Sequence, residues 1–128
     1  MEKIIYSAVV LDEASHIKLE LLLEREYPDA YKNWKLYAHH MTICMGELPE
    51  NLKEKIGTTV KLEVIAIGDT DKAIAVKVNG FYSKNKNPHV TLAVNIKRGG
   101  KPVMSNEITN WTPFHGYTLT GTVKELTN

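Results

Sequence analysis

The sequence predicts an α+β fold with mainly antiparallel strands and flanking helices. An apolar run at residues 4–11 is followed directly by a capped helical segment at residues 13–26. Farther on, residues 58–67 and 73–78 have strand-like patterns on either side of a Gly-Asp-Thr-Asp turn, which predicts a β-hairpin. The chain has 128 residues, enough for one hydrophobic core, so we assign residues 1–128 to a single domain.

The first strand and the first helix have well-marked limits. The strand at residues 4–11 is almost wholly apolar and is predicted to be buried. Asp12 occupies an N-cap position, and the helix is expected to cover residues 13–26 because Pro28 prevents its continuation. Its core-facing stripe is predicted to consist of Ala14, Ile17, Leu21 and Leu22. We expect His16, on the flank of this helix, to be solvated.

The last part of the chain supplies a short helix and a closing strand. Ser105 is expected to cap a helix that ends at Asn110. Residues 117–123 alternate in polarity and predict the final strand. Residues 1 and 128, at the chain ends, are expected to fray.

Composition and charge narrow the class of protein. Hydrophobic residues make up 43% of the chain and charged residues 24%, which is typical of a soluble globular domain. The net charge of +1 argues against binding to long DNA or RNA, which relies on many basic contacts. The single cysteine, Cys44, cannot form an internal disulfide and favours a reducing compartment. No secretory signal or membrane-spanning apolar run is present, so we expect a cytoplasmic protein with no membrane partner.

A repeated His-x-Thr motif is the most informative pattern in the chain. His40 and Thr42 head one strand-like segment, and His89 and Thr91 head another. Since side chains alternate faces along a strand, each histidine shares a face with its threonine. The opposite faces carry apolar residues that are predicted to enter the core: Met41, Ile43 and Met45 in the first segment, and Val90, Leu92 and Val94 in the second.

Two such strands side by side would place two imidazoles and two hydroxyls around one point. One imidazole can accept a proton while the other donates one, and the hydroxyls can stabilise charge on phosphate oxygens. This chemistry requires neither a metal nor another cofactor, and we expect none. His39 and His40 should point to opposite faces of their strand, which argues against a shared zinc ion. The alternative is that both histidines are ordinary residues at strand starts.

Two loops have more than one interpretation. Residues 27–37 contain Tyr27, Tyr31, Trp34 and Tyr37, whose rings either cover the edge of the core or form a flap that stacks on a base. Residues 81–87 contain Lys84 and Lys86 and form either a solvated tip or a rim that attracts phosphate.

Four segments together resemble the two-histidine phosphoesterases. They are Val-Leu-Asp-x-x-Ser at residues 10–15, His-Met-Thr-Ile at 40–43, Pro-His-Val-Thr-Leu at 88–92, and Ser-Asn-x-Ile-x-x-Trp at 105–111. Within that superfamily the chain looks most like phage anti-CBASS nucleases, which destroy cyclic oligonucleotide signals. It also resembles the cyclic phosphodiesterase domain of fungal and plant tRNA ligases.

This resemblance implies a bilobal α+β fold in which the two motif strands face each other across a central cleft. It implies that His40 and His89 are an acid/base pair and that Thr42 and Thr91 donate hydrogen bonds to phosphate. Three further residues are implied to bind the substrate: Tyr6, Glu107 and Trp111.

The sequence therefore leads to three functional hypotheses. The first is a phosphodiesterase that cleaves 3′–5′ bonds in small cyclic oligonucleotides, acting in the host cytoplasm if the chain is encoded by a phage. The second keeps this chemistry but acts on 2′,3′-cyclic phosphates at RNA ends during repair. The third is a non-catalytic module that sequesters nucleotides.

Overall fold

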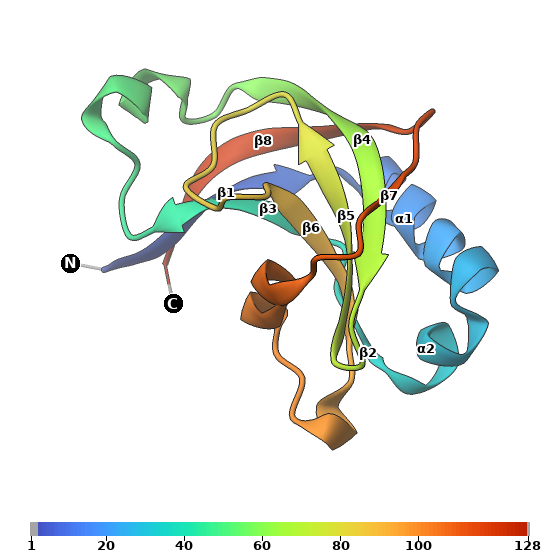
Figure 1. The fold of residues 1–128 in the computed structure, drawn as a ribbon. Coiled ribbons are helices and arrows are strands. Elements are labelled where there is room, and N and C mark those ends of the chain that lie inside the picture. The colour runs from blue at the N-terminus through green and yellow to red at the C-terminus, as the bar shows by residue number, and fades with distance from the viewer. Residues whose placement is uncertain (1–2, 128) are drawn as a thin grey trace.

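The computed structural model describes residues 3–127, which form two α-helices, eight strands and three 3₁₀ helices (Figure 1). The strands are β1 (Ile4–Leu11), β2 (Lys35–Leu36), β3 (His40–Met45), β4 (Thr59–Asp69), β5 (Ala73–Asn79), β6 (His89–Val94), β7 (Thr112–Pro113) and β8 (Thr118–Thr127). The α-helices are α1 (Glu13–Glu26) and α2 (Pro28–Asn33), and the 3₁₀ helices are η1 (Glu50–Lys55), η2 (Ile96–Arg98) and η3 (Pro102–Glu107). No helix within the described range is long and apolar enough to cross a membrane. Residues 1 and 128, at which we expect fraying, lie outside that range.

Six of the strands close into an antiparallel barrel. Hydrogen-bonded neighbours follow the order β6-β3-β1-β8-β4-β5, and β5 pairs in turn with β6. The short strands β2 and β7 add to β6 and β4, respectively. Closure gives each of these six strands a partner on both sides, although β3 and β6 share only one bridge pair in the described residues. The predicted α+β class with antiparallel pairing is confirmed, in the form of a barrel with α1 and α2 at its side (Figure 1).

Helix α1 has the predicted limits but buries a different face. The Asp12 side chain accepts a hydrogen bond from the Ser15 amide at 2.8 Å, which confirms the predicted N-cap. Its buried residues are Ser15, Leu19, Leu22 and Leu23. The predicted stripe is therefore wrong except for Leu22, since Ile17 is 46% exposed and Leu21 is 60% exposed.

The buried face of α1 contains one polar residue, Ser15, which the hydrophobic pattern of the sequence does not assign to the core. Ser15 is 3% exposed, and its hydroxyl accepts a hydrogen bond from the Thr120 amide of β8 at 2.8 Å. Because this bond satisfies the hydroxyl, Ser15 can occupy a core position next to Leu19. The buried face of α1 is therefore shifted around the helix relative to the predicted one.

The predicted hairpin is confirmed as β4 and β5. Thr70 closes its turn, since its hydroxyl accepts hydrogen bonds from the Lys72 and Ala73 amides, both at 3.1 Å. The short helix expected from Ser105 to Asn110 lies earlier, as the 3₁₀ helix η3. Pro102 explains this difference, because a proline favours the first turn of a helix.

The apolar faces of the two motif strands contribute to one continuous core. Met41 and Ile43 of β3 and Val90 and Leu92 of β6 are all 0% exposed, as predicted. They belong to the same buried cluster as the leucines of α1 and the apolar residues of β4, β5 and β8. The core therefore fixes both motif strands from one side and directs the remaining side chains of each motif to the other.

Candidate active site

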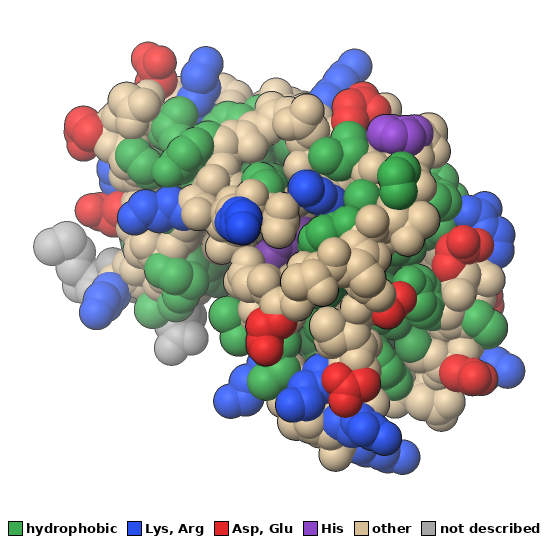
Figure 2. All heavy atoms as spheres, in the orientation of Figure 1, with side chains coloured by type: hydrophobic (Ala, Val, Ile, Leu, Met, Phe, Trp, Pro, Cys, Tyr) green, Lys and Arg blue, Asp and Glu red, His purple; other side chains and the backbone are tan. Residues whose placement is uncertain are grey.

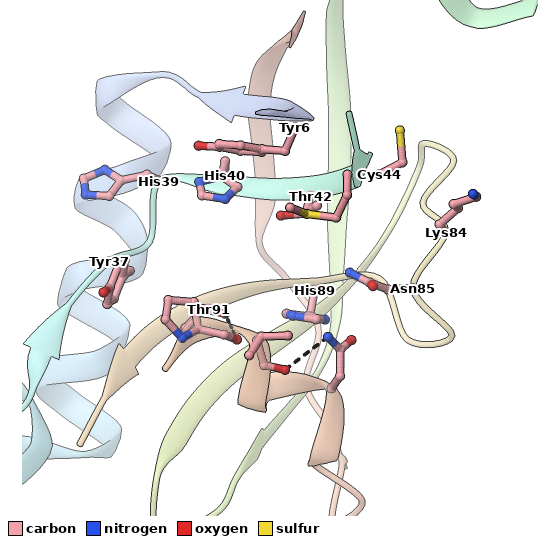
Figure 3. Close-up of a pocket in the computed structure, with 14 residues that line it drawn as sticks. Tyr6, Tyr37, His39, His40, Thr42, Cys44, Lys84, Asn85, His89 and Thr91 are labelled. Carbon is pink, nitrogen blue, oxygen red and sulfur yellow. Dashed lines mark hydrogen bonds between the residues drawn. The ribbon is translucent and has the colours of Figure 1, made fainter. Parts of the chain in front are cut away.

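The barrel brings the two His-x-Thr motifs together. Met41 of β3 and Val90 of β6 form an antiparallel bridge pair. Continued by one residue in each direction, this register places each histidine across from the threonine of the other motif. Figure 3 shows His40 on β3 and His89 on the neighbouring β6, and both side chains line the same pocket. The sequence-predicted convergence of the motifs is thus present in the structure.

All four motif side chains line one pocket of about 610 Å³. The other lining residues come from β1, the segment before β3, the end of β3, the loop before β6, and η3: Tyr6, Tyr37, His39, Cys44, Met45, Lys84, Asn85, Pro102, Val103 and Asn106. The described lining as a whole, with the four motif residues included, contains one Lys and three His and no Asp or Glu. This charge distribution suits an anionic ligand, and the apolar residues suit a flat organic ring.

His89 is held in one tautomer by the backbone. It is 7% exposed, and its Nδ1 lies 2.7 Å from the carbonyl oxygen of Asn87. A carbonyl can only accept, so Nδ1 carries the proton and donates it. In the neutral ring, Nε2 therefore has a free lone pair. Burial lowers the pKa of His89, and the bond to Asn87 partly opposes this shift.

His40 has a different electrostatic environment. Its pKa is also lowered, first by burial and then by the positive charges that His39 and His89 can carry. Its ring lies 5.3 Å from the ring of Tyr6, measured between centroids, at an interplanar angle of 42°. Both imidazoles therefore favour the neutral form near pH 7, and His89 retains a protein acceptor that stabilises a proton on its ring.

The two threonine hydroxyls differ in their partners. Thr91 Oγ1 lies 2.8 Å from Ser105 Oγ and 3.3 Å from the carbonyl oxygen of Pro102, to which it donates. Ser105 is 1% exposed, so η3 supports Thr91 from inside the protein. Within residues 3–127 the Thr42 hydroxyl makes no hydrogen bond to protein and is free to bind a ligand. Ser105, which the sequence suggested as a helix cap, instead supports the site.

The chain enters β3 through a strained turn that α1 holds in place. Ala38 has φ of 68°, a left-handed conformation that is unfavourable for a residue with a Cβ. Its amide donates to the Thr91 carbonyl at 2.8 Å, and its carbonyl accepts from His16 Nδ1 at 2.9 Å. The ring of His39 stacks on that of His16, with 4.6 Å between centroids. The expectation of a solvated His16 is therefore wrong, because its ring is half-buried and hydrogen-bonded.

A β-bulge in β3 adds Met45 to the pocket. Residue pairing with β1 shifts by one, since Ala8 pairs with Thr42 whereas Ser7 pairs with Cys44. The extra residue reverses the alternation beyond it. Cys44 is therefore 5% exposed, and Met45 is 74% exposed and lines the pocket. The prediction that Met45 enters the core is wrong for this reason.

The three residues implied to bind substrate occupy different places. Tyr6 lines the pocket next to His40. Glu107 is exposed at the end of η3 and is not among the residues that line the pocket. Trp111 is also outside the lining, and its ring lies against Gly68, where an added Cβ would come within 2.8 Å of it. Its Nε1 is buried without a hydrogen-bond partner in the described residues.

Several lining residues were not assigned to the site from the sequence. Tyr37 and Lys84 lie in the two segments that had alternative interpretations, and both line the pocket. The first of these segments was predicted as a loop, which is wrong, because it contains α2 and β2. Asn85 lies in the same loop as Lys84, and Asn106 lies in the 105–111 segment that carries the family resemblance. Val103 carried no signal in the sequence, because an exposed apolar residue outside a regular element has no periodicity to mark it. Among residues 3–127, no group of three or more His, Cys, Asp or Glu side chains is arranged to hold a metal ion.

No protein-family model matches the chain, and no curated protein sequence matches it.

Proposed function

We propose that this chain is a metal-independent phosphodiesterase that cleaves 3′–5′ bonds in small cyclic oligonucleotides by general acid–base catalysis. The observation that supports it most is the convergence of both His-x-Thr motifs on one pocket whose described lining contains no carboxylate. Two imidazoles on opposite sides of a pocket can transfer protons at the two ends of an in-line displacement. Two hydroxyls beside them can stabilise the charge that grows on the phosphate oxygens.

In the proposed first step, one histidine accepts the proton of the ribose 2′-hydroxyl as its oxygen attacks phosphorus. The other histidine donates a proton to the departing 5′-oxygen, which leaves a 2′,3′-cyclic phosphate that water can open later. We assign the donor role to His89, because the Asn87 carbonyl stabilises a proton on its ring. We assign the acceptor role to His40, whose protonation is disfavoured by burial and by its two neighbouring histidines.

One threonine from each motif strand is available to bind the phosphate. Thr42 has a free hydroxyl beside His89, and Thr91 has a hydroxyl beside His40 that Ser105 supports. We propose that each donates to a different non-bridging oxygen. We further propose that the barrel is a compact form of the two-histidine phosphoesterase fold, with the seam between β3 and β6 in the position of the central cleft.

A 2′,3′-cyclic phosphate at an RNA end is the second candidate substrate, because the same four side chains could open it. A pocket of about 610 Å³ suits a small cyclic molecule, and the near-zero net charge gives little attraction for a long RNA. A non-catalytic nucleotide-binding module would require neither the fixed tautomer of His89 nor two converging imidazoles.

The test is incubation with a panel of cyclic dinucleotides, cyclic trinucleotides and RNA oligomers ending in a cyclic phosphate, with chelator present and products read by mass spectrometry. His40→Asn and His89→Asn should each lower kcat/KM about 10²- to 10⁴-fold. The double variant should be no worse than the worse single variant if the pair acts as a unit. His115→Asn is the matched control, because His115 is exposed and outside the pocket.

Intact cyclic oligonucleotides after incubation with the unmodified protein would contradict the substrate assignment. Cleavage of the RNA oligomers alone would instead support the second candidate. Activity that disappears on chelation would contradict the metal-independent mechanism.

A further inference from the structure

The loop between β5 and β6 returns to the site and is fixed to β3. Beyond the Met41–Val90 bridge, the two motif strands separate, and residues 83–85 take over the hydrogen bonding of β3. Ser83 Oγ donates to the Thr42 carbonyl at 2.8 Å, and the Lys84 amide donates to the Ile43 carbonyl at 2.7 Å. The Asn85 amide in turn donates to Ser83 Oγ at 3.2 Å. The loop backbone is therefore held at a defined place beside the pocket.

This anchoring places a cation at one end of the pocket. Figure 3 shows Lys84 beyond Thr42, with Tyr37 and His39 at the opposite end. Lys84 is exposed and is the single lysine among the described residues that line the pocket. Within residues 3–127 it forms no ion pair, in contrast to Lys53, which lies 2.8 Å from Glu125. The Lys84 charge is thus available to a ligand.

An apolar side chain, that of Met45, lines the same pocket as this cation and the motif side chains. Met45 follows Thr42 along β3, and the bulge turns it to the pocket side, where it is 74% exposed. The pocket lining therefore combines the hydroxyl and imidazole groups of the motifs with the apolar Met45 side chain and the Lys84 ammonium group. A ligand made of two phosphates joined through a nucleoside needs the same three kinds of group.

We propose that Lys84 binds the phosphate next to the scissile one, so that the site is built for substrates with at least two phosphodiester groups. This inference rests on the proposed function and adds the substrate class to it. An ammonium group binds phosphate as a point charge without strict geometry. A ligand with one phosphate engages the histidines and threonines and leaves Lys84 unused.

The test measures equilibrium binding in the His89→Asn background by calorimetry, so that the ligands stay intact. The probes are a 3′,3′-cyclic dinucleotide, which has two phosphates, and a nucleoside 3′-monophosphate, which has one. Adding Lys84→Gln should raise the Kd of the dinucleotide about tenfold, as expected for loss of one charge-assisted contact. The Kd of the monophosphate should change less than about twofold.

Lys86→Gln is the matched control, because Lys86 is exposed in the same loop but does not line the pocket. It should leave both affinities unchanged, and Lys84→Arg should largely restore dinucleotide binding. The effect of Lys84→Gln should shrink as salt is raised, because screening weakens the Lys84 contact in the reference protein.

An unchanged dinucleotide affinity in the Lys84→Gln variant overturns the proposal. An equal loss for both ligands also overturns it, because Lys84 would then act on the loop or on the scissile phosphate. These outcomes are independent of turnover: if the unmodified protein leaves the cyclic oligonucleotides intact, the proposed function fails while the binding comparison still decides the role of Lys84.

Discussion

Replacing Ser105 by alanine tests how the Thr91 hydroxyl is prepared for phosphate binding. The Thr91 hydroxyl has two partners, Ser105 Oγ at 2.8 Å and the Pro102 carbonyl at 3.3 Å. Thr91 donates to the Pro102 carbonyl, so its proton must turn to a phosphate oxygen when the ligand binds. Ser105 can donate to the Thr91 oxygen and keep it in position during that change, and Ser105→Ala removes this contact. Because Ser105 is 1% exposed, water cannot readily replace its hydroxyl.

The expected magnitudes follow from the charges involved. A hydrogen bond from Thr91 to a charged phosphate contributes about 1.5–3 kcal/mol, so Thr91→Val should lower kcat/KM about 10- to 150-fold. The bond between Ser105 and Thr91 joins two neutral groups and contributes about 0.5–1.5 kcal/mol, so Ser105→Ala should lower kcat/KM about 2- to 10-fold. In the Thr91→Val background, Ser105→Ala should have almost no further effect.

The assay is a double-mutant cycle on the substrate that the protein cleaves, with folding of each variant checked by urea denaturation. The Thr42→Val background is the control, because Ser105 makes no contact there and its loss should remain fully additive. The reasoning is refuted if Ser105→Ala lowers kcat/KM by the same factor in the Thr91→Val background as in the unmodified protein.

Three further outcomes are expected. Burial lowers the pKa of both His40 and His89, so the form with one protonated and one neutral ring is most populated below about pH 6.5. A pH profile of kcat/KM should therefore peak below about pH 6.5. A peak above pH 7 would contradict the assignment of the two histidines as acid and base. Because of the same pKa shifts, the unfolded chain binds protons at these two histidines more readily than the folded chain does. The free energy of unfolding measured with urea should therefore fall as pH falls below about 6.5, and it should fall less in the variant that carries both His40→Asn and His89→Asn. Leu22→Ala, at a fully buried position, should cost about 2–5 kcal/mol in the free energy of unfolding, whereas Leu21→Ala, at a position 60% exposed, should change it by at most about 0.5 kcal/mol; similar values for the two would contradict the observed packing of α1.

Local signals in the sequence predicted the elements well. Asp12 marks the start of α1 and Pro28 lies just beyond its end. Both signals are local, because a cap bonds to an amide a few residues away and proline has no backbone N–H to continue the helix. The turn at Thr70 identified the β4–β5 hairpin for the same reason. The side chains of His40, Thr42, His89 and Thr91 were correctly grouped, because period-two alternation holds within each short motif.

Features that depend on pairing between distant segments were not predictable in the same way. The bulge that exposes Met45 arises from the register between β1 and β3, and the buried position of Ser15 depends on an amide of β8. Barrel closure requires β5 to pair with β6, which no local pattern encodes. The support of Thr91 by Ser105 likewise requires η3 to pack against β6, which the sequence does not reveal.

The pairing of β3 with β6 has a mechanical consequence. In the described part of the chain these two strands share one bridge pair, whereas the other neighbours in the barrel share several. The two imidazoles therefore lie on either side of the strand pair that has the fewest bridge pairs in the barrel. A phosphate bound by residues of both strands would add contacts across this pair. Ligand binding should therefore raise the free energy of unfolding of the barrel.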